Sequence, residues 1–331
     1  MAGLTAMEAT MKRALSCCAV LLTAALVTPA LRADVKTTET SSVAFEGMLG
    51  AMMNRISGAS KGTTTTISVK GNRMSRMSDT TGQIVDLTEQ KIYSVDVRKK
   101  EYTVTTFAQM REQMEKLKAD MAKQQQSVDP ETKKAMAETG KQMEFDVEAK
   151  PTGQQKTIAG QNAREFLLTI TMRQQGMKIE ESGGLVMTNN LWMAPHIAAM
   201  DELQEFNMKF IKAVYGEMFS GLSPQQAGPM SSMVPGLASL MTRMATETRK
   251  IQGSPVASTM VIESVKSAEQ LKNASAATPS SGISGMLAKR MGGGSSGPRS
   301  KVMTSANETL TIGTAATAED VAIPAGFKLK D

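Results

Sequence analysis

The stretch from Thr63 to Thr106 constrains the fold of this chain more than any other. Short runs in which apolar and polar residues alternate are separated by turn residues, as in the pairs around Gly71 and Gly82. Such a pattern predicts an antiparallel β-meander with one apolar face and one face in water. Its predicted strands surround Ile67 and Val69 and then cover Arg73–Ser78, Gln83–Asp86, Lys91–Val97 and Glu101–Thr106. The apolar face of this sheet has to be buried against another part of the chain.

Strands are also predicted on both sides of the meander. Each is a short run with apolar alternation, and Ala159–Asn162 has the composition of a hairpin turn between two of them. The predicted strands are Val35–Phe45, Phe145–Lys150, a hairpin that begins at Lys156 and whose second strand is Arg164–Met172, Met177–Glu181, Gly184–Trp192, Gln252–Val265 and Lys301–Ile312.

Two parts of the chain change to the helical period, in which apolar residues recur every three or four positions. We expect helical inserts at about 107–143 and 197–251, and a further short helix at 46–57. The first insert has an apolar stripe that begins at Phe107 and is followed by a polar helix at 131–143. The region at about 273–300 is rich in Gly, Ser and Ala, which predicts a flexible linker.

The first 33 residues have the pattern of an export signal. Lys12 and Arg13 precede an apolar run, Ala14–Val27, and small residues follow it. The run has about 14 residues and is shorter than the ~20 that a membrane-spanning helix requires. We therefore expect cleavage after Ala30 or Ala33, no integral membrane segment in the mature protein, and a periplasmic or secreted location. The true start is Met1 or Met11.

Composition excludes several classes of site. Both cysteines, Cys17 and Cys18, lie inside the predicted signal, so the mature chain has no disulfide and no thiol chemistry. The net charge is +6, and the one dense basic run outside the signal, Arg98–Lys100, lies at a predicted turn. Only 4% of the residues are aromatic. Nucleic-acid binding is not expected, because it requires clustered basic residues and aromatic residues among them.

No catalytic, metal or cofactor site is predicted. The single histidine, His196, stands at the start of the second helical block, and no G-x-S-x-G sequence precedes a predicted helix. The acidic pair Glu180–Glu181 lacks the spacing of a metal-binding helix. Gly292, Gly294 and Gly297 match a dinucleotide-binding pattern by letter, but no strand precedes them. The chain is expected not to be an enzyme, and a hydrolase that uses His196 stays open as an alternative.

Four segments together resemble a known family: KTIAGQNAREFLLTI, a strand that ends in LWMAP, IQGSPVASTMVIESV and the final VAIPAGFKLKD. They are similar to an exported bacterial domain family of unknown function that resembles the outer-membrane lipoprotein carriers. The resemblance covers 34–331 apart from the inserts and the linker. It implies an α+β fold, in which helices cover the concave face of a strongly curved antiparallel sheet, a half-open barrel. In the carriers, a cavity between sheet and helices receives acyl chains.

The second helical block supplies the candidate cavity wall. The chain has 28 methionines, and methionine is a flexible residue that suits varied apolar partners. The same helical stripes are equally typical of a solid core. The residues predicted to line a cavity are Met200, Leu203, Phe206, Phe210, Leu237 and Met241. The sequence therefore favours a non-catalytic periplasmic protein that holds a lipid or a lipoprotein acyl chain. A cell-envelope module that binds other proteins, without a small ligand, is the alternative.

Overall fold

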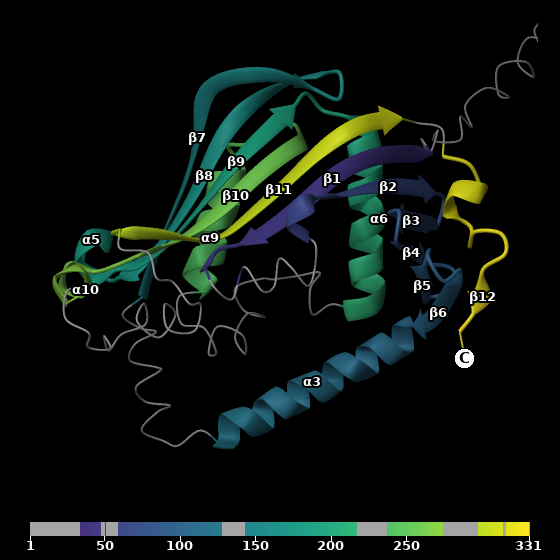
Figure 1. The fold of residues 1–331 in the computed structure, drawn as a ribbon, viewed down its shortest axis with the longest axis horizontal. Helices are drawn as coiled ribbons and strands as arrows, with labels where there is room; N and C mark the ends of the chain where they lie inside the picture. Colours follow the sequence, from purple (N-terminus) through teal and green to yellow (C-terminus); the bar gives the residue numbers. More distant parts are fainter. Residues whose placement is uncertain are drawn as a thin grey trace, which may run out of the picture. The chain divides into compact units, whose positions relative to one another are not determined.

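Twelve strands form one sheet in the computed structural model, which describes residues 34–47, 50, 59–127, 143–216, 237–273, 297–313 and 316–330 (Figure 1). The strand order in the described residues is β12-β6-β5-β4-β3-β2-β1-β11-β10-β9-β8-β7, so the sheet is curved but not closed. The pairs are antiparallel, except that β12 (Lys328–Leu329) runs parallel to β6. The expected α+β class with a large curved antiparallel sheet is confirmed, and β12 makes it a mixed sheet.

The predicted meander is confirmed and forms one half of the sheet. Its strands follow one another in space as they do in the chain, because each turn joins neighbouring strands. β3 ends at Met77, one residue earlier than expected, since the hydroxyl of Ser78 accepts the N–H of Thr81 at 3.2 Å and closes the turn. The strands are β2 (Thr63–Lys70), β3 (Arg73–Met77), β4 (Thr81–Asp86), β5 (Lys91–Asp96) and β6 (Glu101–Thr106).

The other half of the sheet contains five longer strands, and β1 (Val35–Phe45) joins it to the meander. β1 pairs with β2 on one side and with β11 on the other. Ala159 and Gly160 form the predicted hairpin turn with φ of 47° and 75°, the conformation that a two-residue hairpin requires. The five strands are β7 (Met143–Ile158), β8 (Gln161–Gln174), β9 (Gly184–Ala194), β10 (Ser254–Val265) and β11 (Arg299–Gly313).

The strand predicted at Met177–Glu181 is wrong, because a short helix, α5 (Ile179–Ser182), forms there. The Glu181 carboxylate accepts the backbone N–H of Lys178 at 3.2 Å, which stabilises the first turn of a helix. Only Ile179 enters an apolar cluster, with Val186 and Val265. A helix of four residues with one buried side chain is too short to show the helical spacing of apolar residues. Its sequence therefore looks the same as that of a short strand.

The helical blocks contain α3 (Phe107–Ser127), α6 (Ala198–Tyr215) and α9 (Leu237–Thr248), and the short α10 (Ala268–Asn273) was not predicted. Gly216, with φ of 61°, ends α6. Most of the helices predicted at 46–57 and 131–143, and the part of the predicted linker at 274–296, lie outside the described residues. Two 3-10 turns, η1 (Ala59–Lys61) and η2 (Glu319–Val321), complete the described elements. Among these helices, none has both the length and the apolar character needed to cross a membrane.

One face of the meander and of β1 packs against α6. Phe206 and Val214 of α6 are buried there, and Phe107, the first residue of α3, contacts Phe210 edge to face at 5.5 Å between ring centroids. We call this cluster the α6 core. Its fully buried members are Val35, Ile67, Val69, Met74, Val85, Ile92, Phe107, Ala199, Phe206 and Val214.

The opposite face of the meander is also covered, so the expectation of a face in water is wrong. Ile84 and Val85 are adjacent apolar residues that point to opposite faces, and Ile84 joins a second cluster with Tyr93 and Val95. The C-terminal segment, residues 316–330, covers this cluster with Ile323 and Phe327. The end of the chain, which includes Ile323 and Phe327, therefore packs on the second face of the meander.

Candidate functional site

The six residues predicted to line a cavity divide between two helices. On α6, Phe206 is buried in the α6 core, and Leu203 and Phe210 pack against it. Met200 is half-buried on the same helix. On α9, Met241 is 41% exposed, and Leu237 is the first residue, whose side chain lies outside the described part of the structure.

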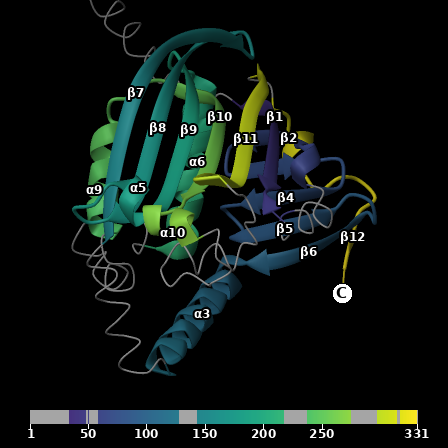
Figure 2. The ribbon, with the colours of Figure 1, turned by 60° about the vertical axis from the view of Figure 1, so that its left-hand side comes forward.

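The two helices contact different parts of the sheet. α6 packs on β1 and β2 in the middle of the strand order, whereas α9 packs on β7 at one end of it (Figure 2). The space between α6 and the meander is filled by Leu203, Phe206 and Phe210 together with the strand residues of the α6 core. Three of the predicted cavity residues are thus brought together, and they form packed core.

The face of the sheet that packs against α6 also carries apolar residues in the second half of the sheet. Val35 and Phe45 lie an even number of residues apart on β1 and so share one face, and Val35 belongs to the α6 core. The strand register then aligns one apolar residue from each of six neighbouring strands in a single row, and all six side chains are half-buried. The row is Val147, Ile170, Met187, Ile262, Met303 and Phe45. We call it the apolar row.

Beside the apolar row, the reverse face of the same strands is more polar. Moving one residue along each strand gives a second row, in which four of the six residues are charged or carry a hydroxyl group. Its members are Glu148, Thr169, Thr188, Val261, Thr304 and Ala44. The second half of the sheet is therefore amphipathic, and its apolar side is the side on which α6 packs against the first half.

Sequence reasoning placed the cavity wall on the helices and missed the sheet. The signal was present in the alternation of β8, where Phe166, Leu168, Ile170 and Met172 are every second residue. What the sequence lacks is the register that aligns β8 with four other strands and with Phe45, since register depends on pairing between distant segments.

A cavity with a volume of about 630 Å³ lies between the β7–β8 hairpin and α9, and its lining is mostly polar. Glu247 of α9 accepts the backbone N–H of Ala149 at 2.9 Å and binds Lys250 at 2.6 Å. The bond from Lys250 and then the bond from Ala149 hold the pKa of Glu247 below its usual value. The lining residues are Asp146, Val147, Glu148, Ala149, Lys150, Thr169, Thr171, Glu247 and Lys250.

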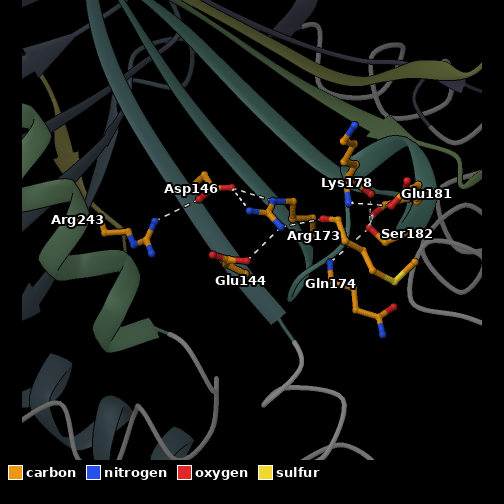
Figure 3. A network of polar contacts seen from close by, with 10 residues as sticks. Glu144, Asp146, Arg173, Gln174, Lys178, Glu181, Ser182 and Arg243 are labelled. Atoms are coloured by element: carbon orange, nitrogen blue, oxygen red, sulfur yellow. Dashed lines mark hydrogen bonds and ion pairs between the residues drawn. The ribbon is translucent and has the colours of Figure 1, made fainter.

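Arg173 connects the elements at one end of this cavity (Figure 3). Its guanidinium group binds Asp146 at 2.8 Å and Glu144 at 3.1 Å, both on β7, and donates to the carbonyl of Met177 at 2.7 Å. Arg243 of α9 binds the other oxygen of Asp146 at 3.2 Å. Arg173, Arg243, Asp146 and Glu144 each have a partner of opposite charge. These ion pairs, with the bond to the Met177 carbonyl, hold α9 and the turn before α5 against the β7–β8 hairpin.

The other titratable groups do not assemble a reactive centre in the part of the chain that the structure describes. The His196 side chain is 72% exposed, and its Nε2 contacts the carboxylate of Asp201. No group of three or more metal-ligating side chains occurs among the described residues.

Comparison with models of known protein families finds no match for this chain, and comparison with curated proteins finds no significant match.

Proposed function

We propose that this chain is a non-catalytic periplasmic binding protein that holds a lipid or a lipoprotein acyl chain on the apolar row. The observation that carries the proposal is the alignment of six half-buried apolar side chains across β7, β8, β9, β10, β11 and β1. At about 4.8 Å per strand, such a row is roughly 24 Å long, enough to lie along a whole acyl chain. Each buried methylene contributes about 0.8 kcal/mol to binding.

The proposed architecture is a half-open barrel, which requires a strongly curved sheet. It is supported by Lys156 of β7, whose ammonium group lies 3.6 Å from Glu308 of β11 and 4.5 Å from the ring centroid of Trp192. Four strand spacings separate β7 from β11 in the sheet order. A flat sheet would hold these strands about 19 Å apart, farther than two side chains reach, so strong local curvature accounts for the contact.

We also propose that residues 1–33 direct export and are removed. The support is the sequence pattern of Lys12, Arg13 and the apolar run that follows. Sequencing the N-terminus of protein purified from the cell envelope tests this step. A terminus at residue 31 or 34 supports the proposal, and a mature protein that retains residues 1–30 contradicts it.

Native mass spectrometry of protein purified from the cell envelope tests the binding function. We expect a mass increment that corresponds to a lipid and that is lost after extraction with organic solvent. Recovery of the bare chain under conditions that preserve a known lipid carrier would contradict the proposal.

A protein-interaction module is the second candidate function, and α3 favours it. Phe107 is fully buried, but Leu117, further along the same apolar stripe, is 55% exposed. An apolar stripe that leaves the core after its first turns suits a protein partner. In the same mass-spectrometry experiment, a second polypeptide in place of a lipid would favour this function.

A further inference from the structure

Asn189 interrupts the apolar face of the sheet one residue pair away from the apolar row. It pairs with Leu168 of β8 and with Met260 of β10, and Met187 and Leu191 are its neighbours on the same face of β9. Four apolar side chains thus surround one amide group.

The side-chain carbonyl of Asn189 has no hydrogen-bond partner among the described residues, although this oxygen is buried from solvent. Leaving a buried acceptor unpaired costs about 1–3 kcal/mol, and most such groups in folded proteins find a donor. A leucine at this position would complete the apolar surface without that cost. The polar atom is therefore better explained by a donor that arrives with a ligand.

Further polar residues lie on the same face beside Asn189. Met260 pairs with Asn189 on one side and with Ser305 on the other, and the next row contains Ser258 paired with Asn307. These residues form a polar patch next to the apolar row. An acyl chain whose head lies beside Met187 would therefore place its polar group at this patch and its tail along one arm of the row.

We propose that Asn189 selects acyl ligands that carry a hydroxyl or amide N–H donor near the head of the chain. This inference rests on the proposed function, because it assumes that the apolar row holds the chain. The Asn189 carbonyl would accept the donor's hydrogen bond within an apolar surround, where an unpaired acceptor discriminates strongly against a ligand that lacks the donor. Fully capped ligands, in which an ether or ester replaces the donor, would leave the carbonyl unpaired.

The test compares two probes that differ in one donor: a long-chain 1-alkanol and the methyl ether of the same alcohol. Each competes with a fluorescent fatty acid for the purified mature chain. We expect the alkanol to bind about tenfold more tightly, because the ether leaves the buried carbonyl unsatisfied. In Asn189→Leu the two probes should bind equally, with the ether bound at least as tightly as by the wild type.

Thr188→Leu is the matched control, since it adds the same side chain one residue away on the reverse face and should keep the tenfold preference. Equal binding of both probes to the wild type would overturn this inference and leave the proposed function standing. A preference that survives in Asn189→Leu would also overturn it. Binding of neither probe, nor of the fluorescent fatty acid, would contradict the proposed function itself. The wild-type ratio decides the matter even if Asn189→Leu does not fold.

Discussion

Glu247 and Ala149 join a helix to the outer edge of the sheet. The Glu247 carboxylate of α9 accepts the backbone N–H of Ala149 at 2.9 Å. Ala149 belongs to β7, which ends the strand order, so this N–H points away from β8 and has no strand to bind. Unpaired groups on a long edge strand are a template for pairing with another chain. Glu247 occupies the position that a carbonyl of such a chain would take.

Glu247→Ala should expose this edge. We expect a lower free energy of unfolding, because one hydrogen bond is lost, and self-association that increases with protein concentration. Thermal denaturation and light scattering over a concentration series measure the two effects. Glu247→Gln keeps an acceptor and should stay close to the wild type. An alanine variant as stable and as monomeric as the wild type would show that the bond does not protect the edge.

Phe206→Ala should destabilise the protein by about 3–5 kcal/mol, because the side chain is buried in the α6 core and no other group fills its space. Met208 lies on the same helix and is 52% exposed, so Met208→Ala is the control and should change stability by less than about 0.5 kcal/mol. Chemical denaturation of both variants measures the difference. A small loss for Phe206→Ala would mean that α6 borders an open cavity, as the sequence also allowed.

Local pattern predicted the strands well and the partners of the helices poorly. The meander and β1 were found because alternation and turn residues lie within each segment. The helical stripe around Phe206 showed that one face is buried, but nothing in its period names β1 and β2 as the surface it meets. The cover that Phe327 gives to the second face of the meander was missed for the same reason, since it depends on contacts between distant parts of the chain.

Acid should release the C-terminal segment from the sheet. Asp320 binds Lys36 at 2.6 Å and accepts the N–H of Thr317 at 2.8 Å, and these bonds, the one from Lys36 first, lower the pKa of Asp320 from 3.8. Because the folded-state pKa lies below the unfolded one, this contribution is complete above about pH 5 and is lost as the pH falls through the lowered pKa. The hydrogen-exchange protection factors of residues 316–330, which are corrected for the intrinsic rate at each pH, should therefore fall below about pH 4.

Asp320→Asn is the control for the acid experiment. It keeps an acceptor for Thr317 but removes the charge that binds Lys36, so the segment should exchange faster at pH 7 by an amount that corresponds to about 1 kcal/mol or less. Its protection factors should also depend less on pH than those of the wild type. Equal pH dependence in both proteins would assign the acid effect to other carboxylates.

Met187→Glu tests the central claim, that the apolar row binds an acyl chain. The substitution places a charge in the middle of the row, whereas Thr188→Glu places the same charge one residue away on the polar face. Titration with a fluorescent fatty acid, with thermal melts of the same samples, measures affinity and folding together. We predict that Met187→Glu lowers the affinity by about tenfold or more while Thr188→Glu leaves it unchanged. A wild-type protein that binds no acyl probe, or two variants that bind it equally, would contradict the account.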